Sequence, residues 1–294
     1  MKSSVILIYN PFARRAADRE IVRAETFLEK KGFAVEVLRT ERGGHACHLA
    51  AEAVTVAPSL IVAAGGDGTV NEVINGVVGT EIPLAVLPMG TTNVLAKELA
   101  IPEDLYGALE AAITRKPRRV SLGKVETGGK ISPATRYFCL MAGIGLDGKT
   151  VHDVNASFKK LAGKAAYIFS GLKNIVKYSP ERLSIIVDGR DYSGYSAVVG
   201  KAARYGGNFK VTPDADLLDP FIFACIFEGG RRRDLLRYSL GVIRGSHLRY
   251  RDVVYIKATE IEIRGTAHMQ VDGDYLGLTP ARISVAKDAL YLVY

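Results

Sequence analysis

The sequence predicts two domains, an α/β domain built on a parallel sheet followed by an antiparallel β-sandwich. Residues 1 to about 121 alternate short apolar strands with segments of helical periodicity, which is typical of a parallel sheet covered by helices. From residue 122 on, short strands are joined by turn signals such as Asp-Gly, which favour antiparallel hairpins. We therefore expect an α/β domain over 1–121 and a β-sandwich domain over 122–294.

The elements of the first domain follow one another in order. Apolar runs with β-branched residues predict strands at "SVILIYN", "AVEVLRT", Leu60 to Ala64 and "IPLAVLP". Apolar residues at helical spacing predict helices over 18–31, over 45–56, from residue 70 onward and over 93–99. Helices that alternate with strands in this way place the ligand of such a fold beyond the carboxyl ends of the strands.

Four polar or glycine-rich segments occupy those carboxyl ends. They are Asn10 and Pro11, Thr40, the turn from Gly65 to Thr69, and "PMGTTN" after the fourth strand. In the turn, glycines let backbone N–H groups approach a bound phosphate, and the helix that follows adds unpaired N–H groups and a positive dipole. The hydroxyl of Thr69 is able to cap that helix. An ordinary strand-to-helix turn with an acidic cap explains the same residues.

The pattern of the second domain predicts β-hairpins. "RLSIIVDGRDYSGYSAVVG" is strand, Asp-Gly turn and strand, and further short strands continue to the C-terminus. Helical segments are expected from Phe158 to Val176 and from Arg231 to Gly241. The first mixes lysines with apolar residues, which fits a membrane surface or packing on the sandwich. "GIGLDG", residues 143–148, matches a dinucleotide fingerprint but lacks the surrounding βαβ unit, so we reject a nicotinamide site there.

Composition and charge narrow the function classes. The chain has 294 residues, 48% of them hydrophobic, and its three cysteines lack CxxC spacing, which favours a reducing compartment. No apolar run approaches the about 20 residues of a membrane span, and no signal peptide is recognisable, so we expect a cytoplasmic protein. A formal charge of +8 favours polyanions, namely nucleic acid, nucleotides or anionic lipid headgroups. Without a zinc-finger or RNA-binding signature, no nucleic-acid partner is expected.

Taken together, "GGDGTVNEV", "NP" after the first strand, the threonine after the second and "PMGTTNVLAKEL" resemble the diacylglycerol kinase catalytic family. That family includes bacterial soluble lipid kinases and the sphingosine and ceramide kinases. The resemblance runs from Asn10 nearly to the C-terminus. It implies an α/β nucleotide domain and a β-sandwich domain that both contribute to one site, with ATP and Mg²⁺ as cofactors. The reaction it implies is transfer of the γ-phosphate to a lipid hydroxyl.

The resemblance also implies which residues bind the nucleotide. Those that match its loops are Asn10, Pro11, Arg14, Thr40, Gly65, Gly66, Asp67, Gly68, Thr69, Asn71, Glu72, Gly90, Thr91 and Asn93. An acid in a phosphate-binding turn is explained if Asp67 holds the Mg²⁺ that accompanies the triphosphate. In "NPFARRA", Arg14 and Arg15 replace a small Ser-Gly ending and either contact phosphate or face solvent.

The expected catalytic stretch lies near the C-terminus. Gln270, Asp272, Gly273 and Asp274 match the family's Q-x-D-G-E, with Asp in place of Glu at the last position. We expect one of the two aspartates to accept the proton of the acceptor hydroxyl and the other to assist, with Asp67 as the third catalytic residue. The similar "IIVDGR" hairpin, which contains Asp188, has no implied role.

A structural Mg²⁺ site is implied at "VTPDADLLDPF". The carboxylate of Asp219 and the carbonyls of Asp216 and Phe221 would hold the ion, since oxygen ligands suit a hard cation. Pro220 replaces the usual glycine of this loop and fixes its φ angle.

Three function classes follow from these observations. The first is a lipid kinase that works at a membrane surface through transient peripheral contact. The second is a soluble metabolite kinase, since NAD kinases share the GGDGT turn. The third is a nucleotide-binding regulator without turnover, which the departures at Val94, Asp274 and Pro220 suggest. The acceptor lipid and the oligomeric state, a homodimer included, are left open.

Overall fold

The structure is a computed structural model that describes residues 3–128, 134–153 and 179–294. The helix expected from Phe158 to Val176 lies outside the described residues. The chain divides into two compact units, one formed by Met1–Ser121 with Lys287–Tyr294 and the other by Leu122–Ala286. Within the described residues, no helix is both long enough and apolar enough to cross a bilayer.

The first unit contains the expected parallel sheet. Its strands are β1 (Ser4–Tyr9), β2 (Ala34–Arg39), β3 (Leu60–Gly65) and β4 (Leu84–Pro88). They are ordered β2-β1-β3-β4, and every pairing is parallel. Every residue of β3 and β4 is buried, because helices cover both faces of the sheet, and this burial explains the unbroken apolar runs.

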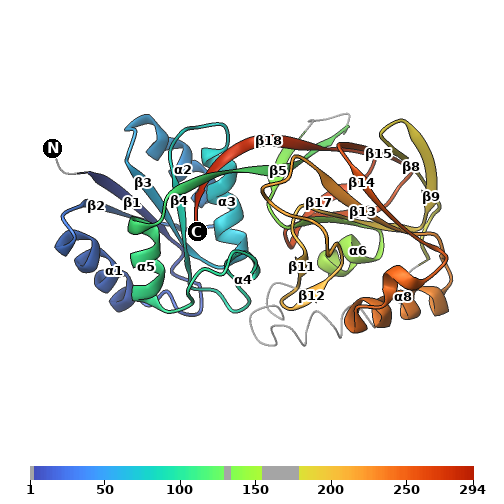
Figure 1. Ribbon diagram of the computed structural model, residues 1–294, viewed down its shortest axis with the longest axis horizontal. Helices are drawn as coiled ribbons and strands as arrows, with labels where there is room; N and C mark the ends of the chain where they lie inside the picture. The colour runs from blue at the N-terminus through green and yellow to red at the C-terminus, as the bar shows by residue number, and fades with distance from the viewer. Residues whose placement is uncertain (1–2, 129–133, 154–178) are drawn as a thin grey trace. The chain divides into compact units, whose positions relative to one another are not determined.

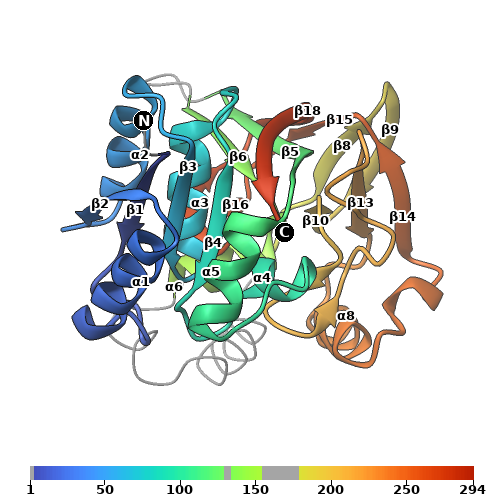
Figure 2. The same cartoon turned by 60° about the vertical axis from the view of Figure 1, so that its left-hand side comes forward.

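Four of the helices described in this unit lie in two pairs, and α4 is in neither pair (Figures 1 and 2). They are α1 (Asp18–Lys30), α2 (His45–Thr55), α3 (Asp67–Val77), α4 (Val94–Glu98) and α5 (Leu105–Thr114). Helix α1 packs with α5, where the rings of Phe27 and Tyr106 lie 5.6 Å apart, and α2 packs with α3. Helix α5 was not predicted, although Asp104 marks its start by accepting a hydrogen bond from the Gly107 N–H at 2.8 Å.

The second unit is the expected antiparallel sandwich. One sheet is ordered β14-β13-β10-β7-β16-β17. Its strands are β7 (Met141–Ile144), β10 (Ser196–Gly200), β13 (Ile222–Phe227), β14 (Val253–Ala258), β16 (His268–Val271) and β17 (Asp274–Leu278). The other sheet is formed in this unit by parts of β5 (Pro117–Thr127) and β18 (Ala281–Val293) with β6 (Ala134–Phe138), β8 (Leu183–Val187), β9 (Arg190–Gly194) and β15 (Glu260–Arg264). Apolar side chains from both sheets form one core.

Smaller elements complete the second unit. They are α6 (Leu146–Asp153), α8 (Arg232–Arg244), the short strands β11 (Arg204–Tyr205) and β12 (Phe209–Lys210), and the 3₁₀ turn η1 (His247–Arg249). The sequence predicted α8 to end at Gly241, but the helix continues for three more residues until Gly245, whose φ of 67° ends it.

The last strand departs from the sequence expectation. The start of β18 pairs with β15 in an antiparallel register, while its end pairs in parallel with β4 through Leu292 and Val293. Residues 287–294 therefore belong to the first unit rather than to the sandwich. The alternating pattern of "ARISVAKDALYLVY" predicts a strand correctly, but such a pattern carries no information about which strand it pairs with.

Candidate functional site

A cavity of about 270 Å³ opens at the carboxyl ends of the first three parallel strands. Its lining combines four residues expected from the sequence with four that were not, namely Asn10, Thr40, Thr69 and Glu72 with Phe12, Arg42, Gly43 and Ala46. The polar loops predicted to converge beyond β1, β2 and β3 thus meet around one hollow.

Asn10 ties the first of these loops to helix α3. Its side-chain amide donates to the Thr69 hydroxyl at 3.0 Å, and its Oδ1 accepts from the Phe12 N–H at 2.9 Å. Thr69 lies inside the first turn of α3, and Gly66 is the residue that precedes the helix. The expectation that the Thr69 hydroxyl caps α3 is therefore wrong, and this hydroxyl instead joins the helix to the loop after β1.

Glycines bring the backbone of two loops together beside this cavity. A Cβ built on Gly90 would lie 2.5 Å from the Gly66 Cα, so position 90 has no room for a side chain, and a Cβ built on Gly66 would lie 3.3 Å from the Gly90 Cα. At Gly68, in contrast, a Cβ would meet nothing within 4 Å. Packing therefore does not require glycine at position 68, and its absent side chain leaves the N-terminal turn of α3 open to an approaching anion.

Asp67 is the first residue of α3, and its carboxylate links two helices. Its Oδ1 accepts a hydrogen bond from the Leu95 N–H, 3.1 Å away, at the start of α4. Burial raises the pKa of the Asp67 carboxyl, while the N–H groups of Val94 and Leu95 and the charge of Lys97 lower it. These groups do not fully offset the cost of burying the negative charge of Asp67. Its carboxylate, at an open helix N-terminus, is a hard oxygen donor that fits Mg²⁺.

Glu72 lines the cavity but uses its carboxylate on the protein itself. One oxygen accepts from the Gly44 N–H at 2.8 Å and the other from the Ala46 N–H at 3.1 Å. Gly44 precedes helix α2 and has a left-handed backbone conformation. As a glycine, it has no side chain with which to cap the helix. Glu72 supplies that cap from 28 residues away and fixes the loop that carries Arg42.

Other expected nucleotide contacts have structural roles or lie on the surface. Asn71 is fully buried in α3, where its Oδ1 accepts from the Asn75 amide at 3.2 Å. Asn93, with a φ of 49°, is bonded in both directions to the backbone of Gly90, at 2.9 Å and 3.2 Å. Both shape the site from within the protein. Arg14 and Thr91 are exposed.

In the second unit, the carboxylate of Asp272 is surrounded by donors. Its Oδ1 accepts from the N–H groups of Leu140 and Met141 at 3.0 and 2.9 Å. Its Oδ2 accepts from the N–H of Cys139 at 2.9 Å and from the thiol of the same residue at 3.3 Å. Burial raises the pKa of Asp272 to about 6, although these donors lower it. Asp272 therefore holds the loop of residues 139–141 in place.

Asp274 differs from Asp272 in its surroundings. Its side chain is 50% exposed, and one carboxylate oxygen lies 3.7 Å from the Arg136 guanidinium. Of the two aspartates in the expected catalytic stretch near the C-terminus, it is the one with an accessible carboxylate. Gln270, which is buried, accepts from the Gly273 N–H at 2.7 Å and fixes the turn that separates the two.

The Asp188 turn repeats the geometry of the Asp272 turn. Both aspartates have a left-handed backbone, with φ values of 44° and 47°. The carboxylate of Asp188 accepts from the Thr259 N–H, the Thr259 hydroxyl and the Glu260 N–H at distances of 2.8–3.1 Å. Each Asp-Gly turn thus fixes a neighbouring loop through its carboxylate, but Asp188 is exposed to solvent.

Sequence reasoning missed Asp147, which the structure links to the expected catalytic stretch. Its Oδ2 accepts from the Gln270 amide at 2.6 Å, and its Oδ1 accepts from the Tyr205 hydroxyl. A Cβ on Gly143 would collide with this carboxylate and with Gln270, which explains the glycine. The signal was present as the acid of "GIGLDG", but the motif was tested only as a dinucleotide fingerprint.

Comparison with known proteins decides the family. A sequence model of the diacylglycerol kinase catalytic domain matches residues 4–125, and one described as a YegS C-terminal NAD kinase beta sandwich-like domain matches residues 141–294. A diacylglycerol kinase of Bacillus subtilis is 30% identical over 282 residues, which cover 93% of this chain and 90% of that protein. The chain belongs to the diacylglycerol kinase family. It is a phosphotransferase with an alcohol group as acceptor.

A second relative agrees with this family, and two solved structures share the fold. A diacylglycerol kinase of Staphylococcus aureus is 32% identical over 290 residues, which cover 96% of this chain and 89% of that protein. The solved structure of a diacylglycerol kinase from Bacillus anthracis superposes with a TM-score of 0.77, at 23% identity, over 99% of this chain and 97% of that one. Yeast NADH kinase shares the fold at a TM-score of 0.56 and 12% identity, covering 99% and 83%.

The structural Mg²⁺ site implied by the resemblance does not fit this chain. The ammonium of Lys201, a residue with no exposed surface, donates to the Asp219 carbonyl at 2.8 Å and to the Asp216 carbonyl. The Asp216 carbonyl is one of the expected ligands of the ion, and the Asp219 carbonyl belongs to the residue whose carboxylate was expected as another. Burial lowers the pKa of Lys201 to about 8, so the group is still mainly charged at neutral pH. A lysine takes the place of the expected cation.

Lys201→Met should therefore destabilise the second unit, whereas a chelator should not. Removal of the ammonium leaves two loop carbonyls without their donor, at a cost of about 2–4 kcal/mol in the free energy of unfolding. The measurement is the free energy of unfolding in denaturant, for Lys201→Met and for the wild type with and without EDTA. Loss of stability on chelation, with no effect of Lys201→Met, would restore the metal interpretation.

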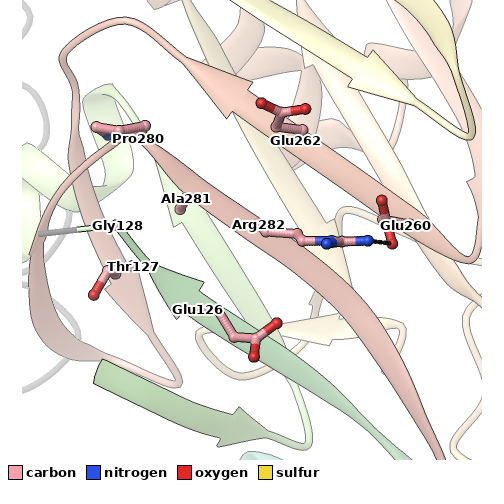
Figure 3. A pocket seen from close by; sticks show the side chains of 8 residues that line it. All are labelled: Glu126, Thr127, Gly128, Glu260, Glu262, Pro280, Ala281 and Arg282. Carbon is pink, nitrogen blue, oxygen red and sulfur yellow. Dashed lines mark hydrogen bonds and ion pairs between the residues drawn. The ribbon is translucent and has the colours of Figure 1, made fainter. Parts of the chain in front are cut away.

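A larger cavity of about 550 Å³ in the second unit contains none of the expected site residues (Figure 3). It is lined by Glu126, Thr127, Gly128, Glu260, Glu262, Pro280, Ala281 and Arg282. Each of its three glutamates forms an ion pair with a lysine or an arginine. The pairs are Glu126 with Lys124, Glu260 with Arg282 and Glu262 with Arg264. Paired, solvent-exposed charges are typical of a sheet surface, so this hollow is not the candidate site.

Proposed function

We propose that the chain transfers the γ-phosphate of ATP to the hydroxyl of a lipid alcohol such as diacylglycerol, in a Mg²⁺-dependent reaction. The observation that carries the proposal is the cavity at the carboxyl ends of β1, β2 and β3, which is lined by Asn10, Thr40 and Thr69. It lies at the place where parallel α/β sheets bind nucleotides, in the unit that matches the diacylglycerol kinase catalytic domain. The names of the relatives support a lipid as the acceptor.

The first unit binds and orients the nucleotide. The open N-terminal turn of α3 at Gly68 offers backbone N–H groups to phosphate oxygens. Asn10 and Thr69 hold the facing loop at a fixed distance from that turn. Asp67 would hold Mg²⁺, which neutralises charge on the phosphates when bound.

The second unit supplies the proton acceptor. We assign that role to Asp274, because its carboxylate is accessible and accepts no backbone hydrogen bond in the described structure. Asp272 acts as a positioning residue, since both of its oxygens are used to hold residues 139–141. The phosphate-binding residues and the assigned proton acceptor belong to different units of the chain.

The test is transfer of radiolabelled γ-phosphate from ATP to extracted lipid, with NAD offered in a parallel reaction. We expect label in the organic phase. Label on NAD would instead support the metabolite kinase, and ATP binding without any transfer would support the regulator.

Asp67→Asn should lower turnover by at least about 100-fold, because an amide is a poor ligand for Mg²⁺. The Asn Oδ1 still accepts from the Leu95 N–H, so the start of α4 and the thermal unfolding midpoint should be preserved. The measurement is initial rate against Mg²⁺ concentration. Full activity of a normally folded variant would rule out the assigned role.

A further inference from the structure

Helix α8 is fixed to the second unit by one face. Leu235, Tyr238 and Gly241 on that face are buried. The Tyr238 ring lies 4.9 Å from the Phe227 ring, and its hydroxyl donates to Asp252 at 2.6 Å while accepting from the Gly229 N–H at 2.8 Å. These contacts fix the rotation of the helix about its axis, so its opposite face always points outward.

That outward face is apolar along its centre. Leu236, Leu240 and Ile243 follow one another at i, i+4 and i+7, and their exposed fractions are 41%, 38% and 47%. The outer face of a surface helix normally carries polar side chains, because its apolar stripe faces the core. Here a second apolar stripe lies opposite the buried one, and exposed aliphatic side chains that form a row indicate a binding surface.

Arginines flank this stripe. At 100° per residue, Arg232 lies on one side of it, and Arg233 and Arg244 lie on the other. Of the nearby acids, Asp234 accepts from the Arg231 N–H at 3.2 Å and lies 3.9 Å from the Arg233 guanidinium, and Asp252 pairs with Arg237. In the part of the chain that the structure describes, neither Arg232 nor Arg244 is in an ion pair.

We propose that the α8 face, formed by Leu236, Leu240, Ile243, Arg232, Arg233 and Arg244, binds the surface of an anionic lipid bilayer. The proposal rests on the proposed function, since a kinase of membrane lipids must work at that surface. Leucine side chains enter the boundary between headgroups and acyl chains, while arginines extend their stems along it and bind lipid phosphates. A second copy of the chain fits the face poorly, because it would bring two sets of arginines together.

The test is partition of the full chain onto vesicles of phosphatidylcholine, with and without phosphatidylglycerol. We expect binding only to the vesicles that contain phosphatidylglycerol, and weaker binding as salt rises. The triple variant Leu236→Ser, Leu240→Ser, Ile243→Ser should lower the partition coefficient on the order of 100-fold. Its matched control is Val22→Ser with Val56→Ser, which removes exposed apolar side chains from the first unit and should bind as the wild type does.

A second pair of variants tests the charges. Arg232→Glu with Arg244→Glu should weaken binding more than Arg115→Glu with Lys116→Glu, an equal change of net charge at exposed positions in the first unit. Equal binding by the serine variant and its control would overturn the proposal. The proposal would also be overturned if the wild type did not bind vesicles and sedimented as a dimer, while the serine variant sedimented as a monomer.

Activity is measured separately, on a diacylglycerol dispersed in detergent micelles. There the α8 variants should turn over at the wild-type rate, since these residues lie outside the catalytic stretch. If no form of the protein phosphorylates the lipid while vesicle binding still depends on α8, the proposed function fails and the membrane surface is retained.

Discussion

Replacement of Asp274 with Asn should lower kcat by a factor of roughly 100 to 10,000, the usual range for loss of a general base. The amide is nearly isosteric but cannot accept the proton of the acceptor hydroxyl. Because the side chain is half exposed and its ion-pair partner among the described residues is Arg136 at 3.7 Å, loss of its charge should leave thermal unfolding unchanged. Steady-state kinetics with ATP and dispersed diacylglycerol give kcat and KM, and KM for ATP should stay within a few-fold of wild type.

Asp191→Asn is the matched control for this prediction. Asp191 is an exposed aspartate of the same unit, on strand β9, and its amide should be neutral in the same assay. If Asp274→Asn keeps the wild-type kcat, Asp274 does not accept the proton, and Asp272 becomes the remaining candidate in the matched stretch.

The fold could be predicted from the sequence because its strongest signals are local. The buried run Leu60 to Gly65 followed by helical spacing from Val70 is enough to identify a strand-turn-helix unit, and four such units imply a parallel sheet. The position of Thr40 at the cavity follows in turn, because carboxyl ends of parallel strands meet at one edge.

The roles of several polar residues could not be predicted, because a sequence motif does not show which hydrogen-bond donors its side-chain oxygens face. Glu72 sits in a sequence that matches a nucleotide-binding turn, yet its carboxylate caps helix α2 by accepting from the N–H of Gly44, 28 residues earlier. Asn93 forms its hydrogen bonds with Gly90, three residues away, and so shapes the loop. Only the three-dimensional position of the backbone N–H groups distinguishes such contacts from contacts to a ligand.

The burial of Lys201 and its contacts with two backbone carbonyls could not be predicted from the sequence either. Lysine is rarely buried, so its position after the strand "SAVVG" reads as the start of a surface loop. Its partners, the carbonyls of Asp216 and Asp219, lie 15 and 18 residues further along the chain. Backbone carbonyls are present in every loop, and no pattern of residue types shows that two of them converge on one amino group.

Asp272→Ala should destabilise the second unit by about 3–5 kcal/mol, and activity should be lost with the fold of this region. The substitution leaves the N–H groups of Cys139, Leu140 and Met141 without their acceptor, and each buried unsatisfied donor costs about 1–3 kcal/mol. Asp272→Asn should lie between alanine and wild type, because an amide NH₂ would face donors where a carboxylate oxygen now accepts. The free energy of unfolding of this unit, measured with denaturant, gives the comparison.

Asp188→Ala is a close structural control, since the two residues have nearly the same positive φ and the same Asp-Gly turn. The backbone strain that alanine adds is therefore similar at both positions. Asp188 is exposed, so water replaces its carboxylate at Thr259 and Glu260, and we expect a loss of about 1 kcal/mol. If the two alanine variants lose the same stability while Asp272→Ala alone loses turnover, Asp272 acts in the chemistry itself rather than by holding residues 139–141.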